Sequence, residues 1–223
     1  MWQGRPCSAV DPRNGRNSPQ RMKTPALTPS DVGSPRLAGS NRVAGSEVIV
    51  VAGGRDIWET SDECHFAHAR VSGDFTLTAN VAALAMADLY TKAGLMLRTS
   101  LEAGAEHVFL LSFGDNQARN RNNGGIEFQF RTQPNAACTG VYPPQPLPAQ
   151  PVFPANFPRV WLRLSRQGDT FAASHSSDGW AWRTLTVHRQ ALPAAAYIGL
   201  AVTSHNVDQT VRAVFRQVEL VQP

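Results

Sequence analysis

Much of the chain after residue 48 alternates apolar and polar residues with a period of two, and this pattern limits the possible folds most strongly. In "DFTLTANV" at 74–81, "GIEFQFRT" at 125–132 and "RVWLRLSR" at 159–166, every second side chain is apolar. Successive side chains of a strand point to opposite faces, so each run predicts a strand with one buried face and one polar face. Turn sequences such as "SGD", "QGD" and "SDG" separate the strand-like runs.

The number of such runs predicts an all-β fold. We identify roughly eleven strands and no convincing long helix in 223 residues, a length that suits one large β domain. Many antiparallel strands in one domain must close into a barrel or pack as two sheets. We predict the second arrangement, a two-sheet antiparallel β-sandwich of the jelly-roll type. In "VRAVFRQVELV" at 211–221 the alternation changes parity around Arg216 and Gln217, which predicts a β-bulge.

Prolines are concentrated in two segments. Six of the sixteen lie in residues 1–35 and eight lie between Pro134 and Pro158. Because proline cannot donate a hydrogen bond to a β-ladder, these segments are expected to lie outside the sheets. We predict a disordered, basic, proline-rich tail at 1–30 and a sandwich domain at 31–223, with a long proline-rich loop at 133–158.

The formal net charge of +4 comes from the predicted tail. Residues 1–30 hold five basic side chains and one acidic side chain, which leaves 16 basic and 16 acidic in residues 31–223. A neutral domain lacks the basic surface that nucleic-acid binding requires, so we predict no nucleic-acid partner. No apolar run reaches the length of a membrane span or a signal-peptide core, so we predict no membrane contact, and the location stays open.

Five stretches resemble a known family when they are taken in order. They are "DIWETSDECHF", "SGDFTLTANV", "KAGLMLRTSL", "SSDGWAW" and "YIGLAVTSHN", and together they are similar to a bacterial family of concanavalin A-like (LamG-like) β-sandwich domains of unknown function. The resemblance spans about Asp31 to Val221 and implies the lectin and glucanase type of sandwich. Such domains usually lie beside glycosidases or in secreted and cell-surface proteins, which implies an extracellular or cell-surface location and carbohydrate-rich surroundings.

The stretch "DECHFAH" at 62–68 contains residue types that bind metals. On a strand, His65 and His68 point to opposite faces, while Cys64 and His68 share a face but lie roughly 13 Å apart. Zinc motifs with short Cys/His spacing are absent, and the nearby carboxylates fit no calcium loop. We therefore predict no metal site and no cofactor, and the pairing of Cys64 with Cys138 stays open.

Glu127 is the strongest candidate for acid–base catalysis. Glycoside hydrolysis uses two carboxylates about 5 to 10 Å apart, but the polar face of this strand offers only Glu127 beside Gln129 and Arg131. A lone carboxylate near an arginine is more typical of a cross-strand ion pair. The G-x-S-x-G motif of serine hydrolases is absent as well. We predict that the chain is not an enzyme.

Nine side chains are candidates for a ligand site, because a small-ligand pocket needs a few polar groups among apolar walls and an indole offers a rigid face to a sugar ring. They are Trp58, His65, Lys92, Arg98, Gln129, Arg131, Trp161, His205 and Asn206. We predict that, if the polar strand faces line a groove, Trp161 and Arg131 converge there with Lys92, Arg98 and His205, while the alternation allows equally that these faces form the convex surface. The alternatives are that Trp58 and Trp161 belong to the core and that His205 and Asn206 form a turn. Trp180 and Trp182 follow "SSDG" and are interpreted as hairpin residues.

Three functions are compatible with these features. The preferred hypothesis is a non-catalytic carbohydrate-recognition or accessory domain whose partner is a glycan or polysaccharide. The second is a protein-interaction or structural module that docks through a sheet face or through "YPPQPLPAQP" at 142–151, a segment suited to polyproline II geometry. The third is a glycoside hydrolase in which Glu127 is the acid or base and Arg131 tunes its ionisation.

Overall fold

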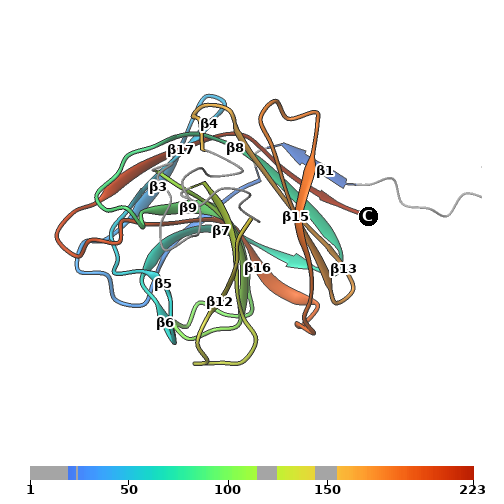
Figure 1. Cartoon of the computed structure of the whole chain (residues 1–223), viewed down its shortest axis with the longest axis horizontal. Helices are drawn as coiled ribbons and strands as arrows, with labels where there is room; N and C mark the ends of the chain where they lie inside the picture. Colours follow the sequence, from blue (N-terminus) through green and yellow to red (C-terminus); the bar gives the residue numbers. More distant parts are fainter. Residues whose placement is uncertain (1–19, 24, 115–124, 144–154) are drawn as a thin grey trace, which may run out of the picture.

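The computed structural model describes residues 20–23, 25–114, 125–143 and 155–223, and these parts of the chain form strands and turns without a helix. Two antiparallel sheets pack face to face (Figure 1). The predicted all-β, two-sheet sandwich is therefore confirmed. Within the described ranges no helix is long and apolar enough to cross a membrane.

The first sheet has eight strands. In spatial order it contains β15 (Arg183–Arg189), β14 (Thr170–Ser176), β13 (Val160–Gln167), β8 (Phe75–Leu84), β17 (Val211–Gln222), β4 (Glu47–Ala52) and β3 (Ser40–Ala44), with β1 (Gln20–Lys23) also paired to β17. The register of β17 against β8 shifts between Arg216 and Glu219, and Gln217 has a positive φ of 48°. This irregularity confirms the bulge that the change of parity predicts.

The second sheet has seven strands. In spatial order it contains β12 (Thr139–Val141), β11 (Ile126–Arg131), β10 (His107–Phe113), β9 (Lys92–Arg98), β16 (Ala195–Thr203), β7 (Cys64–Ser72) and β2 (Thr28–Val32). A separate pair, β5 (Ile57–Trp58) and β6 (Ser61–Asp62), lies in the segment that precedes β7.

The central strands of the seven-stranded sheet are buried on both faces. Its inner face packs against the eight-stranded sheet, where Leu95 and Leu110 meet the side chains of Leu77 and Leu162 in the main core. On the opposite face, a smaller second core forms from nine buried residues: Val32, Ile57, Cys64, Phe66, Met96, Phe109, Leu111, Phe113 and Ala201. Every residue of β9 and β10 is consequently buried. Two-sided burial explains why "HVFLLSF" reads as an almost continuous apolar run.

The observed strands extend into both segments that the prolines predict to lie outside the sheets. β2 begins at Thr28, before the predicted limit between tail and domain at residues 30 and 31, and it pairs Pro29 with Ala67 of β7. The proline is tolerated there because β2 is the edge strand of its sheet. The predicted loop at 133–158 contains β12, which pairs with β11. The predicted disordered tail also contains β1, which pairs with β17. Residues 1–19 and 24 of the tail and residues 144–154 of the loop lie outside the described residues.

Candidate ligand-binding site

The polar face predicted to line a groove is covered. Gln129 and Arg131 share one side of the seven-stranded sheet, as the alternation predicts, but both are buried together with Arg98 and Lys92. Trp161 belongs to the other sheet, on the face turned away from the main core. The predicted convergence of Trp161 with Arg131 is therefore wrong, because alternation fixes the face of a strand within its sheet but not which sheet the strand joins.

Arg131 and Arg98 share Asp62 as a partner. Arg131 donates Nη1–H to Asp62 Oδ2 at 2.9 Å and Nη2–H to Oδ1 at 2.8 Å, and Arg98 Nη1 lies 3.3 Å from Oδ2. All three side chains are fully buried. Arg131 also donates to the carbonyl oxygens of Trp58 and Glu59. Together these bonds hold the β5–β6 segment against the seven-stranded sheet, which closes that face.

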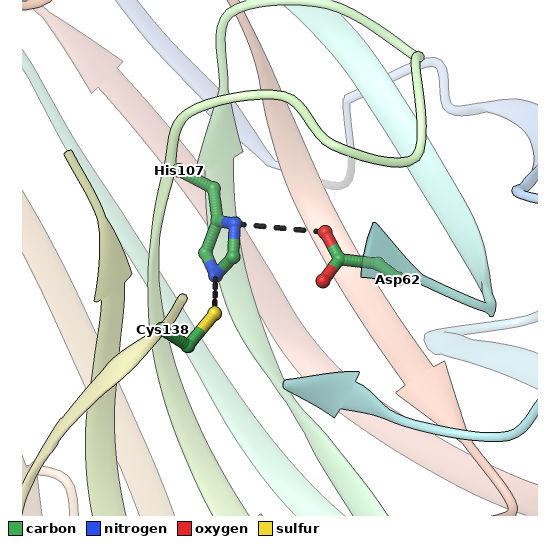
Figure 2. Close-up of side chains that lie close together, drawn as sticks. All are labelled: Asp62, His107 and Cys138. Carbon is green, nitrogen blue, oxygen red and sulfur yellow. Dashed lines mark hydrogen bonds and ion pairs between the residues drawn. The ribbon is translucent and has the colours of Figure 1, made fainter. Parts of the chain in front are cut away.

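Figure 2 shows His107 between Asp62 and Cys138, a grouping that the sequence analysis missed because the three residues lie in distant parts of the chain. His107 Nδ1 lies 3.6 Å from Asp62 Oδ2, and His107 Nε2 lies 3.6 Å from Cys138 Sγ. Both cysteines of the domain, Cys64 and Cys138, are free thiols. The question is whether this cluster suits a metal ion.

The cluster does not suit a cation. The carboxylate and the thiol approach opposite nitrogens of the imidazole, and both oxygens of Asp62 already accept hydrogen bonds from guanidinium groups. Burial raises the pKa of Cys138 to about 12 and lowers the pKa of His107 to about 4. A metal requires the thiolate, and this environment favours the neutral thiol. The positive charge of Arg131 would also repel the ion.

The guanidinium of Arg131 bonds to Asp62, and its influence on the ionisation of the Glu127 carboxylate stays a prediction. The Glu127 carboxylate accepts a hydrogen bond from Gln129 Nε2 at 2.7 Å, and it is 2% exposed. Burial raises the pKa of the nearby Tyr142 to about 12, and the charge of Glu127 adds to this shift. The amide oxygen of Gln129 is buried without a hydrogen-bond partner in the described part of the chain.

Three of the predicted site residues, Trp58, Lys92 and His205, meet around Asp56. Lys92 Nζ donates to Asp56 Oδ1 at 2.6 Å and lies 5.6 Å from the centre of the Trp58 ring. His205 Nε2 lies 3.4 Å from Asp56 Oδ2, and its Nδ1 lies 3.0 Å from Asp88 Oδ1. The hydrogen bond with Asp56 raises the pKa of His205 despite partial burial. Burial opposes ionisation of Asp56, but the bonds from His205 and Lys92 outweigh it and lower its pKa.

His65 and Asn206 make contacts within the fold. His65 is 2% exposed, with Nδ1 at 2.8 Å from Asp31 Oδ1 and Nε2 at 3.0 Å from Asn41 Oδ1. Asn206 Oδ1 accepts a hydrogen bond from the backbone N–H of Asp208 at 2.9 Å. This contact agrees with the alternative prediction that Asn206 belongs to a turn.

An open groove of about 850 Å³ lies on the outer face of the eight-stranded sheet, and we call it the Trp groove. Its principal lining residues are Trp161, Trp180, Trp182, Arg163, Thr78 and Glu219. Trp180 is 89% exposed, the highest value among the large hydrophobic residues that the structure describes. The guanidinium of Arg163 lies 3.7 Å from the centre of the Trp182 ring, and Trp182 Nε1 donates to Gly179 O at 3.1 Å. The prediction that Trp182 packs over its own hairpin is thus confirmed, but it did not include the role of Trp182 in lining this groove.

The turn that carries Trp180 has a defined shape. Asp178 Oδ1 accepts hydrogen bonds from the backbone N–H groups of Trp180 and Ala181 and from the hydroxyl of Ser176. These bonds, led by that from Trp180, lower the pKa of Asp178. Gly179 has a φ of 79°, and a Cβ built on it would lie 3.0 Å from the Trp161 ring. Glycine therefore provides both the left-handed backbone conformation and the close approach to the indole.

Solved structures with the same fold come from several kinds of protein. A functionally unknown protein from Saccharomyces cerevisiae is 15% identical, with a TM-score of 0.64 over 89% of this chain and 97% of that chain. The carbohydrate-binding module CBM66 from Bacillus subtilis is 15% identical, with a TM-score of 0.53 over 86% and 94%. The alginate lyase from Klebsiella pneumoniae is 12% identical, with a TM-score of 0.53 over 82% and 84%. At these identities the similarity shows the fold alone.

The comparison of sequences gives the family. The search of curated protein sequences returned no match. A family model described as "Protein of unknown function (DUF1349)" matches residues 41–223, which is most of the chain. The chain therefore belongs to the DUF1349 family.

Proposed function

We propose that the chain is a non-catalytic carbohydrate-recognition domain whose binding site is the Trp groove. The observation that carries this proposal is the open groove with three indoles, of which Trp180 is 89% exposed. Isolated exposed apolar residues are common, but tryptophans gathered in a hollow with polar groups at its rim are typical of a ligand site. A pyranose has an apolar C–H face that stacks on an indole, and its hydroxyl groups can bond to Arg163, Asp178 and Glu219.

The covered face of the seven-stranded sheet supports the choice of this groove. Lys92, Arg98, Gln129 and Arg131 are 2% exposed or less, so a sugar would reach them only after the β5–β6 segment moved. The proposal therefore keeps Trp161 from the predicted set and replaces the other eight residues with neighbours of Trp161. The partner is a glycan or polysaccharide, and an extracellular or cell-surface location remains a prediction.

The test measures polysaccharide binding by isothermal titration calorimetry or affinity electrophoresis across a panel of soluble glycans. Trp180→Ala should weaken binding by about 1–3 kcal/mol, the scale of one large apolar contact, which is about 5-fold to 150-fold. Because this side chain is exposed, the unfolding free energy should change by no more than about 0.5 kcal/mol. Val187→Ala is the control, since Val187 is 63% exposed and lies outside the groove.

Two results would contradict the proposal. The first is the absence of binding to every glycan of the panel by the folded wild-type chain. The second is binding that survives unchanged in both Trp180→Ala and Trp161→Ala, which would locate the sugar elsewhere on the molecule.

A further inference from the structure

A second hollow of about 500 Å³ adjoins the Trp groove, where β13 begins and β14 ends. We call it the cationic hollow, and its polar lining comes mainly from Arg159, Arg183, His175, Asn156 and Ser177. Trp161 lines both the cationic hollow and the Trp groove. A ligand that stacks on Trp161 is therefore in reach of both.

The two guanidinium groups of the cationic hollow have no acidic partner in the part of the chain that the structure describes. No carboxylate is among the described residues that line the hollow, and neither Arg159 nor Arg183 forms an ion pair with a described carboxylate. Three other exposed arginines do have such partners, since Arg36 pairs with Asp208, Arg55 with Glu63 and Arg216 with Glu47, whereas the exposed Arg42 and Arg189 pair with no described carboxylate and line neither hollow. Two unpaired guanidinium groups at one hollow leave a positive potential that an oxyanion would satisfy with charge-assisted hydrogen bonds.

The groups around the two guanidinium groups also favour a negatively charged ligand in the cationic hollow. His175 lies close enough to Arg183 that the arginine, after burial, helps to lower the pKa of His175 to about 4. The imidazole is then neutral and can share hydrogen bonds without adding charge. The carboxylates of this region, Asp178 and Glu219, line the Trp groove instead. Because these two carboxylates outnumber the single guanidinium of Arg163 there, the Trp groove repels an acidic substituent, and the adjoining hollow attracts it.

We propose that Arg159 and Arg183 bind the acidic substituent, a carboxylate or a sulfate ester, of an oligosaccharide whose neighbouring sugar ring stacks on Trp161. This inference rests on the proposed function, because it requires that the Trp groove binds sugar. It adds that the ligand is an acidic glycan and that its negative group lies on the side of Trp161 away from Asp178 and Glu219.

The experiment compares hexagalacturonate with its fully methyl-esterified form, which has the same sugar chain without the charge. A second pair, sulfated and unsulfated cellohexaose, tests the sulfate ester. Calorimetry at about 50 mM salt should give at least tenfold tighter binding of one acidic form than of its neutral counterpart, and this advantage should shrink as salt is raised. The double variant Arg159→Gln/Arg183→Gln should bind the acidic form no better than the neutral form, with affinity for the neutral form unchanged.

The matched control is Arg42→Gln/Arg189→Gln, which removes the same charge from two exposed arginines outside both hollows. It should keep the preference for the acidic form. The inference is overturned if both members of each pair bind the wild type equally, or if the control variant loses the preference to the same extent. In those cases Trp180→Ala would still weaken binding. If no probe of either pair binds the wild type, the proposed function fails first and the inference fails with it.

Discussion

Replacing Asp62 with asparagine should destabilise the domain strongly. Asp62 is fully buried and accepts three hydrogen bonds from Arg131 and Arg98, both of which are also fully buried. Asp62→Asn keeps the size of the side chain but removes its charge and turns a donor group toward the guanidinium groups. Removing one partner from a buried ionic group costs about 3–5 kcal/mol, because the remaining charge stays buried. That loss is a large part of the ~5–15 kcal/mol that stabilises a typical domain.

Urea unfolding followed by tryptophan fluorescence measures this loss. With a slope of about 2 kcal/mol per molar urea, the unfolding midpoint should fall by roughly 1.5–2.5 M. Asp208→Asn is the control, because the Arg36–Asp208 pair is 70% and 65% exposed and should contribute about 0–1 kcal/mol. A loss below about 1 kcal/mol for Asp62→Asn, equal to that of the control, would refute the reasoning that this cluster holds the β5–β6 segment in place.

Three further predictions concern single residues. Burial lowers the pKa of His107 to about 4. Between pH 6.5 and 4, His107 is therefore protonated in the unfolded chain but not in the folded chain. The unfolding free energy should therefore fall as pH falls through this window, by about 3 kcal/mol at most, and His107→Gln should flatten that slope in urea titrations at several pH values. His205 has a raised pKa, so its NMR titration midpoint should lie above 6.5 and move down in Asp56→Asn; a midpoint that does not move would contradict the bond between them. Gly179→Ala should cost about 1 kcal/mol or more through the positive φ and the contact with Trp161, measured by thermal unfolding, and an unchanged melting temperature would show that the turn is not constrained.

The sequence predicts the fold well because alternation reports burial directly. Strands 125–132 and 159–166 form as expected, and the parity change near Gln217 marks a true bulge. The errors in the predicted limits of the tail and the loop both arise at edge strands. Pro29 reads as a breaker but is compatible with an edge strand, and Thr139 to Val141 is a short edge strand within a proline-rich segment.

The candidate site is harder to predict because alternation gives a face and not its surroundings. Arg98 and Arg131 read as groove residues, but each finds Asp62, which is 36 and 69 residues away in sequence. One signal was available: "HVFLLSF" has apolar residues on both faces, which is typical of a sheet covered on both sides. The Trp groove was missed for a different reason. The turn interpretation of "SSDGWAW" was sound, but it gave no indication that the turn lies over Trp161.

The hydrogen bonds of Arg131 also constrain how the chain folds during synthesis. Its guanidinium bonds to Ala105, Asp62, Glu59 and Trp58, which lie 26, 69, 72 and 73 residues earlier in the chain. Each of these contacts closes a long loop, and contacts of high sequence separation form slowly. Until residue 131 has left the ribosome, Asp62 lacks its principal partner and the second core lacks its cover. A nascent chain that ends before β11 should therefore expose the apolar side chains of Phe109 and Met96 to chaperones.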